Sequence, residues 1–341
     1  MTLTGQTSSL EIRERLFDGE LLNGVDVGAR GGMQNHWRAF AKSIRLDAFE
    51  PDEEACRLQA EAKRPNETWF PLGLGRETGT GKLHVLAKAS SSSLFPPNQE
   101  TNAAYGYSGF TDIARVIDIP LVSLSDTIDK NGRPLPNLMK LDAQGAELDI
   151  LRGMRDEHWR DLMALQIEVE FVEFYSGQPL FHEVDSFMRS KGFIMFDLLL
   201  QRRYRTNGRI RHHFLKRYLG IDRNRHDITA RAIAGDALYL RPPAEILGKS
   251  DRVLFAKFLT ILLIYRCLDE ALWFIEAGSK ATLITNEEAQ GLVEEVRRVA
   301  PRPFIWQRTD WLGKVARRTM KRLNIGRSRK LEYWLDRSWD Y

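Results

Sequence analysis

Short apolar runs alternate with helical segments along most of the chain. From residue 24, runs rich in apolar residues end at glycine, proline or acidic residues, and segments with apolar positions every three or four residues separate several of them. The expected strands are residues 24–27, 45–49, 68–74, 82–87, 117–124, 138–141, 165–171, 193–200 and 236–240. The expected helices are residues 33–42, 53–63 and 183–191. This order predicts an α/β fold: a doubly wound, mostly parallel sheet with helices on both faces.

The pattern changes twice at the end of the predicted sheet. The basic segment 201–231 joins the last two strands without a long helix, which favours an antiparallel pair at the sheet edge. Pro242-Pro243 then ends the strand pattern, so we place a domain boundary between residues 1–243 and 244–341. The second part is expected to be a basic helical extension. Its expected helices are residues 253–277, 286–299 and 312–323.

Three local patterns lie in the middle of the chain. The glycines between residues 73 and 81 predict a hairpin turn that leads into the strand 82–87. A loop rich in serine, proline and asparagine follows at 89–98, of the kind that serves as a lid or substrate loop in α/β domains. Ser125 is the expected cap of a short helix.

Charge is distributed unevenly along the chain, although the net charge is only +4. Residues 201–231 hold ten basic residues against two aspartates, and residues 301–341 hold eleven basic against four acidic residues. The two segments therefore carry +8 and +7, which leaves −11 on the rest. Such basic segments suit an anionic partner such as a phosphorylated glycan carrier, lipid headgroups or nucleic acid, and a solvated basic face is the simpler alternative.

The cysteine content and the apolar runs of the sequence indicate the cellular compartment of the protein. Cys56 and Cys267 lie far apart and match no metal or redox spacing, which indicates a reducing compartment and two buried thiols. Met1–Leu10 lacks the pattern of a secretory signal, and the apolar stretch Phe258–Tyr265 is too short to cross a bilayer. The expected location is the cytoplasm, with peripheral membrane contact through the basic C-terminal segment as an alternative.

The first strand ends in a glycine-rich turn, Asp26-x-Gly28-x-x-Gly31. Glycine has no Cβ, so the backbone at Gly28 and Gly31 can adopt conformations closed to other residues and can approach a ligand closely. A dinucleotide-binding turn needs a second glycine near the pyrophosphate, where this chain has Arg30. The turn therefore favours a nucleoside ligand without a pyrophosphate. Close packing of strand and helix is the alternative.

Two later strand ends add polar groups to the same crevice. Glu50 follows the second strand, where a carboxylate can accept hydrogen bonds from ribose hydroxyls or can cap the next helix. The segment Lys140–Glu147 places the carboxylates of Asp142 and Glu147 after a later strand. Carboxyl ends of parallel strands meet at one edge, where doubly wound folds bind their ligands.

Together, Asp26–Ala29, Phe49–Pro51 and Lys140–Glu147 resemble the three ordered motifs of the FkbM-family methyltransferases. The resemblance covers roughly residues 22–243 and implies a Rossmann-like methyltransferase sheet. It also implies a methyltransferase that uses S-adenosylmethionine as cofactor to O-methylate hydroxyls of sugars and secondary metabolites. The chain departs from the family at Arg76, where an acidic residue often follows the third strand. The residues expected to hold the cofactor are Asp26, Gly28, Ala29, Arg30, Gly31, Glu50, Pro51 and Asp142.

Methyl transfer to a hydroxyl needs alignment of the reactants and a group that accepts the hydroxyl proton. Asp142 is the expected base, with Glu147 or Glu170 as substitutes. Structural alternatives are that Glu147 lies at the positive end of its own helix and that Lys140 pairs with Asp142 or Glu168. No histidine has metal-ligand spacing with a carboxylate nearby, so no metal is expected.

Competing functions come from the basic regions. The chain could keep the fold as a non-catalytic adaptor at a membrane or glycan carrier, and an NAD-dependent oxidoreductase is disfavoured by Arg30. The amphipathic segment 312–323 fits membrane docking or packing against the main domain or a second subunit in a homo-oligomer. Nucleic acid is not the expected substrate, because the four tryptophans after residue 305 suit a core or interface better than base stacking. The expected acceptor is a small molecule or glycan, and the basic segment 201–231 suits an anionic one.

Overall fold

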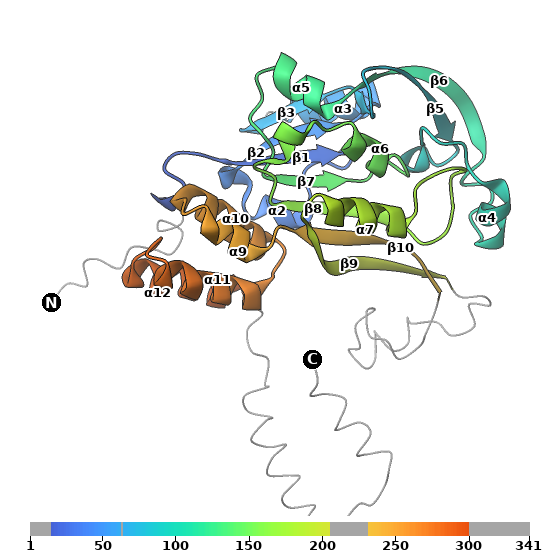
Figure 1. The fold of residues 1–341 in the computed structure, drawn as a ribbon. Coiled ribbons are helices and arrows are strands. Elements are labelled where there is room, and N and C mark those ends of the chain that lie inside the picture. The colour runs from blue at the N-terminus through green and yellow to red at the C-terminus, as the bar shows by residue number, and fades with distance from the viewer. Residues whose placement is uncertain (1–14, 63, 205–230, 300–341) are drawn as a thin grey trace, which may run out of the picture.

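The computed structural model describes residues 15–62, 64–204 and 231–299. Its main sheet has seven strands in the order β3-β2-β1-β7-β8-β10-β9 (Figure 1). Their bounds are β1 Leu22–Val27, β2 Ile44–Phe49, β3 Glu67–Phe70, β7 Leu138–Leu141, β8 Ala164–Glu170, β9 Ile194–Tyr204 and β10 Arg231–Leu240. Neighbours from β3 to β8 pair in parallel, and β10 is antiparallel to both β8 and β9. The predicted doubly wound sheet with an antiparallel edge is confirmed.

A second sheet differs from the expected hairpin. Its strands are β4 Gly73–Leu74, β5 Gly79–Leu86 and β6 Ile113–Val122, in the order β4-β6-β5. The prediction of a β4–β5 hairpin is wrong, because β6 lies between the two strands and pairs with both. The expected strand 68–74 is also divided between the two sheets. Pro71 lies at the division and has no N–H to donate to a ladder.

Helices and short 3₁₀ turns connect and cover these strands. The helices are α2 Asn35–Arg38, α3 Glu53–Glu61, α4 Gln99–Ala104, α5 Leu124–Lys130, α6 Glu147–Arg152, α7 Phe181–Ser190, α9 Pro243–Gly248, α10 Arg252–Ile264, α11 Leu268–Lys280 and α12 Asn286–Val299. The 3₁₀ turns are η1 Ala41–Ser43, η2 Ala89–Ser91 and η3 Asp156–Trp159. The expected helix 33–42 is thus only the short α2 followed by η1.

Alternating side chains of the main sheet enter two separate cores. Leu22 and Leu138 pack in a cluster with residues of α10, α11 and α12, whereas Val27 and Leu141 pack in a second cluster with α5, α6 and α7. Successive residues of a strand point to opposite faces, so this division shows that helices cover both faces. The apolar runs of the sequence therefore reflect strands buried on two sides.

The expected helix 253–277 is two helices. It breaks after α10 at Arg266, whose φ of 56° lies in the left-handed region, and α11 then turns back along α10. The rings of Phe255 and Phe274 stack with centroids 4.7 Å apart, and a Cβ on Gly278 would lie 2.4 Å from Phe255. The division at residue 243 stays a prediction, but α10–α12 share one core with the sheet.

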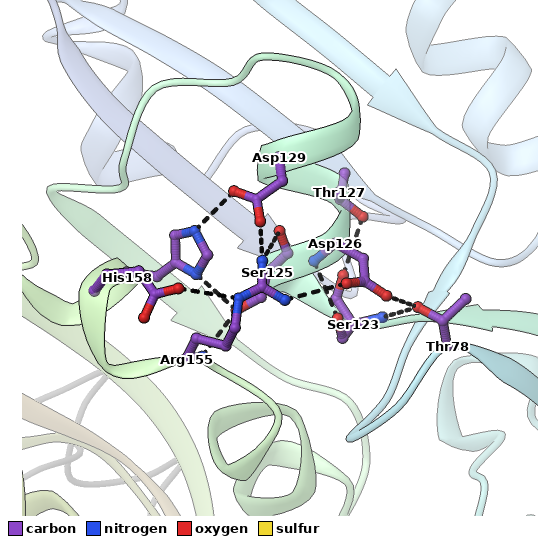
Figure 2. Close-up of polar contacts among 9 residues, drawn as sticks. Thr78, Ser123, Ser125, Asp126, Thr127, Asp129, Arg155 and His158 are labelled. Atoms are coloured by element: carbon purple, nitrogen blue, oxygen red, sulfur yellow. Dashed lines mark hydrogen bonds and ion pairs between the residues drawn. The ribbon is translucent and has the colours of Figure 1, made fainter.

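Ser123, not Ser125, caps α5, because its hydroxyl accepts the Asp126 N–H. Ser125 instead joins the polar network shown in Figure 2. Its Oγ lies 2.8 Å from Nδ1 of His158, and Nε2 of that ring lies 3.1 Å from Asp129. Burial lowers the pKa of His158, so the imidazole is neutral. The Ser125 hydroxyl is fully buried and also accepts the Arg155 N–H, so the cluster ties α5 to η3.

Several sequence predictions fall outside the described residues. These are the N-terminal segment 1–10, most of the basic segment 201–231, the helix 312–323 and the C-terminal tryptophans. Within residues 15–62, 64–204 and 231–299, no helix is long and apolar enough to cross a membrane.

Candidate active site

A cavity of about 830 Å³ lies where the carboxyl ends of β1, β2 and β7 face the second sheet. In Figure 1 the small sheet lies beyond the arrowheads of β1 and β7. The main sheet contributes the glycine turn after β1, the residues after β2 and Asp142 after β7. Residues of β5, β6 and the serine-rich loop form the other wall. The volume is typical of a site for a small molecule.

The glycine turn is held against the strand on either side. The N–H groups of Gly28 and Ala29 both donate to the Phe49 carbonyl, at 3.0 and 3.1 Å. Gly28 has a φ of 73°, and a Cβ there would lie 2.1 Å from the Asp142 carbonyl oxygen. The second left-handed glycine is Gly32, with a φ of 81°, so the expectation that Gly31 takes a conformation closed to other residues is wrong. Gly31 borders open space instead.

Lys140 is the buried cation beneath this turn. Its Nζ lies 3.4 Å from Oδ1 of Asp26 and 3.5 Å from Oδ2 of Asp142, and it donates to the Val27 carbonyl at 3.1 Å. Burial alone would lower the pKa of Lys140, but Asp26 and Asp142 raise it above its ordinary value, so the ammonium stays charged. Asp26 is fully buried and also accepts a hydrogen bond from Gln34. The ion pair therefore fixes the ends of β1 and β7 relative to each other.

Glu50 faces the cavity from the end of β2. Its carboxylate accepts the Asp52 N–H at 2.9 Å, and burial raises its pKa. The cap of α3 is Asp52, which accepts the Ala55 N–H and pairs with Arg30 at 2.8 Å. The alternative in which Glu50 caps that helix is therefore wrong, and its position suits a ligand with hydroxyl groups.

Gln144 connects the two acidic strand ends. Its Nε2 donates to Asp142 at 2.7 Å and to Glu168 at 2.6 Å, while its Oε1 lies 2.9 Å from the Tyr175 hydroxyl. The Ser93 hydroxyl donates to the Gln144 carbonyl at 2.6 Å, which ties the serine-rich loop to the site. Gln144 lies within the Lys140–Glu147 motif, but its bridging role depends on β8 and could not be deduced from spacing.

The two substitute bases lie outside the cavity lining. Glu147 is 3% exposed and accepts the N–H groups of Ala143 at 2.6 Å and Gly145 at 3.0 Å. Burial raises the pKa of Glu147 to about 7. Glu170 is also buried, at the end of β8 opposite Ala234. The geometry agrees with the structural alternative for Glu147, which organises the loop before α6.

Oxygens of Asp142, Glu147 and Glu168 lie within 4.8 Å of one another, a spacing that a divalent cation accepts. Hydrogen bonds within the protein already engage all three, since Gln144 bridges Asp142 and Glu168 and two backbone N–H groups occupy Glu147. The expectation that no metal is required stays a prediction.

Six of the eight residues expected to hold the cofactor line the cavity. They are Gly28, Arg30, Gly31, Glu50, Pro51 and Asp142. Asp26 and Ala29 are buried beneath the turn and do not line it. Arg76 borders a second, smaller cavity and does not line the main one. The strand next to Glu50 is β3, and the residues that follow its end and line the main cavity are Pro71 and Leu72.

Comparisons with known proteins agree with this arrangement. The profile of the Methyltransferase FkbM domain matches residues 26–195. The chain is 30% identical over 182 residues to "Methyltransferase 1" of Beauveria bassiana, an alignment that covers 50% of this chain and 71% of the relative. It is 26% identical over 192 residues to the "31-O-demethyl-FK506 methyltransferase FkbM" of Streptomyces tacrolimicus, covering 49% and 71%.

Solved structures show weaker similarity. The crystal structure of Methyltransferase FkbM from Methylobacillus flagellatus superposes with a TM-score of 0.34 and is 15% identical in sequence. That superposition covers 70% of this chain and 45% of the other.

Substitution of Gly28 tests the close approach of the turn to Asp142. Gly28→Ala should lower the free energy of unfolding by about 3 kcal/mol or more, because the new Cβ meets backbone and the φ is strained. Gly31→Ala is the control and should change it by no more than about 1 kcal/mol. Equilibrium denaturation measures both, and equal losses would contradict the assignment.

Burial of Glu147 predicts a specific pH dependence. Its pKa is about 7 in the folded protein against an ordinary value of 4.5, so the unfolded chain releases this proton first as pH rises. Between these values, rising pH should lower the stability of wild type relative to Glu147→Gln, by on the order of 3 kcal/mol in total. Denaturant unfolding of both proteins at pH 5 and pH 8 measures the change, and a pH-independent difference would refute it.

Proposed function

We propose that this chain, which belongs to the FkbM methyltransferase family, transfers a methyl group from S-adenosylmethionine to a hydroxyl oxygen of a sugar, glycan or related metabolite. Family membership establishes methyl transfer as the class of reaction. The observation that carries the finer proposal is the meeting of Gly28, Glu50 and Asp142 at one cavity. These residues follow the adjacent strands β1, β2 and β7.

The volume and the lining of the cavity support S-adenosylmethionine as its ligand. Glu50 can accept hydrogen bonds from ribose hydroxyls, and Pro71 and Leu72 offer an apolar surface for a base at the next strand end. The turn at Gly28–Gly31 lines the cavity, and Gly31 borders open space, which leaves room for the rest of the cofactor. When bound, S-adenosylmethionine supplies an electrophilic methyl group on a sulfonium.

Asp142 is the carboxylate placed to accept the hydroxyl proton. Its side chain is 37% exposed and lines the cavity, whereas Glu147 and Glu170 are buried away from it. The Gln144 amide fixes one Asp142 oxygen, and Lys140 lies 3.5 Å from the other. Asp142 can thus receive the proton as the acceptor oxygen forms its new bond to carbon. A well-placed base contributes about 10²–10⁴-fold to such a step.

Oxygen as the acceptor atom is supported by a relative. The name of the Streptomyces tacrolimicus relative specifies a 31-O-demethyl substrate, so that protein methylates an oxygen. A hydroxyl group also needs a base more than a thiol does, which agrees with the exposed Asp142. Glycan modification in the cytoplasm, with peripheral membrane contact, remains our proposal for the setting.

The competing functions gain no support from the described residues. The adaptor hypothesis depends on the basic tail, which lies outside them. An NAD-dependent oxidoreductase would need backbone close to a pyrophosphate at Arg30, where a side chain instead pairs with Asp52.

Removal of the Glu50 carboxylate tests the cofactor site. Glu50→Ala should weaken binding of S-adenosylmethionine by about tenfold or more, since hydrogen bonds to a charged group contribute roughly 1.5–3 kcal/mol. Glu61→Ala is the control, because that carboxylate lies on the exposed surface of α3. Titration calorimetry measures both affinities, and unchanged binding in Glu50→Ala would remove Glu50 from the site.

Loss of the Asp142 carboxylate tests the base. Asp142→Asn should slow transfer of a labelled methyl group to extracted glycans and metabolites by about 10²–10⁴-fold. The cofactor affinity should change much less, because the side chain keeps its size. Asp149→Asn on α6, outside the main cavity, should keep the wild-type rate. Transfer by Asp142→Asn at the wild-type rate would assign the proton to another group.

A further inference from the structure

One face of the β5–β6 ladder forms the wall opposite the strand ends. Leu83 pairs with Ile117 and Val85 pairs with Arg115 in the antiparallel register. Directly opposed residues of such a pair point to the same face, so these four side chains lie together. All four line the main cavity. The wall is thus an apolar surface that ends in a guanidinium.

The two ends of this wall face different parts of the cavity. At one end, a Cβ on Gly73 would lie 2.8 Å from Leu121 and 3.0 Å from Ile119, next to the surface proposed for the base of the cofactor. At the other end, Val85 and Arg115 lie beside the loop that carries Ser93, whose hydroxyl is bonded to Gln144. The Arg115 end is therefore the end away from the surface proposed for the base of the cofactor, where the acceptor can approach Asp142.

Arg115 has the charge that this end can offer to a ligand. Among described residues, the basic side chains lining the cavity are Arg30 and Arg115. Arg30 is engaged with Asp52 at 2.8 Å, while Arg115 makes no ion pair or hydrogen bond with any residue that the structure describes. The acidic side chain nearest to Arg115 on β6 is Asp118, which also lines the cavity and pairs there with Lys82 at 3.5 Å.

We propose that the acceptor is an amphiphilic anion, with a carboxylate or phosphate bound by Arg115 and an apolar portion lying on Leu83, Val85 and Ile117. A guanidinium binds either anion through paired N–H donors. Burial of apolar ligand surface on the three aliphatic side chains supplies the remaining affinity. This inference rests on the proposed function, because it assigns the acceptor half of the same cavity.

The proposal can be tested without knowledge of the natural acceptor. The probes are four compounds with a ten-carbon chain that differ in head group: decanoate, decyl phosphate, decanol and decyltrimethylammonium. Titration calorimetry on the full chain, below the solubility limit or micelle concentration of each probe, should show at least one anionic probe binding about tenfold tighter than decanol or the cation. The preferred anion distinguishes a carboxylate from a phosphate.

Variants assign the preference to Arg115. Arg115→Gln should abolish the preference for the anionic probes, and Arg115→Lys should retain part of it. Lys280→Gln, on α11 and outside the cavity lining, should bind all four probes as wild type does. Ile117→Asn should weaken all four probes together, because it removes apolar surface without changing the charge.

Equal affinity of wild type for the four head groups, or unchanged anion binding in Arg115→Gln, would overturn the proposal. A parallel titration with S-adenosylhomocysteine separates the two levels of inference. If that titration shows no binding, the proposed function fails while the head-group result still decides the role of Arg115. If cofactor binding is normal and the anion preference is absent, only the assignment of the acceptor fails.

Discussion

The buried ammonium of Lys140 holds the site together. It lies within 3.5 Å of both Asp26 and Asp142 and donates to the Val27 carbonyl just before the glycine turn. A buried charge is costly unless partners surround it, and here the partners come from both β1 and the residue after β7. Asp26 can be fully buried because of this cation. The cation thereby couples the position of the turn to that of the proposed base.

A row of polar side chains across β1, β7 and β8 connects the site with the helices after Pro243. In register, Asp26 lies beside Lys140 and Lys140 beside Gln166. The Tyr265 hydroxyl lies 3.3 Å from the Gln166 amide oxygen and accepts from Trp37. The C-terminal helices therefore cover polar groups of the sheet as well as the apolar residues of the shared core.

The second sheet turns an open sheet edge into an enclosed cavity. Ser93 bonds to the Gln144 carbonyl and the Tyr175 hydroxyl lies 2.8 Å from the Ser91 carbonyl, so the serine-rich loop is fixed beside the acidic strand ends. Enclosure matters for methyl transfer because the reactants must be aligned and water kept away. The loop expected from sequence as a lid is thus built into the wall.

Local sequence determined most of the strands of the main sheet and the polar residues at their carboxyl ends. Glu50 and Asp142 could be predicted because each directly follows an apolar run, and Asp26 because it lies one residue before the end of β1; parallel strands bring such ends to one edge. Tertiary structure alone decided the features that depend on contacts between residues distant in the chain. The position of β6 between β4 and β5, the bridge from Gln144 to Glu168 and the burial of Glu147 are of this kind. Alternation along 115–121 marks one face of a strand, but only the pairing with β5 shows that this face and Arg115 border the cavity. Side-chain periodicity is a local property, whereas strand pairing and desolvation depend on the whole fold.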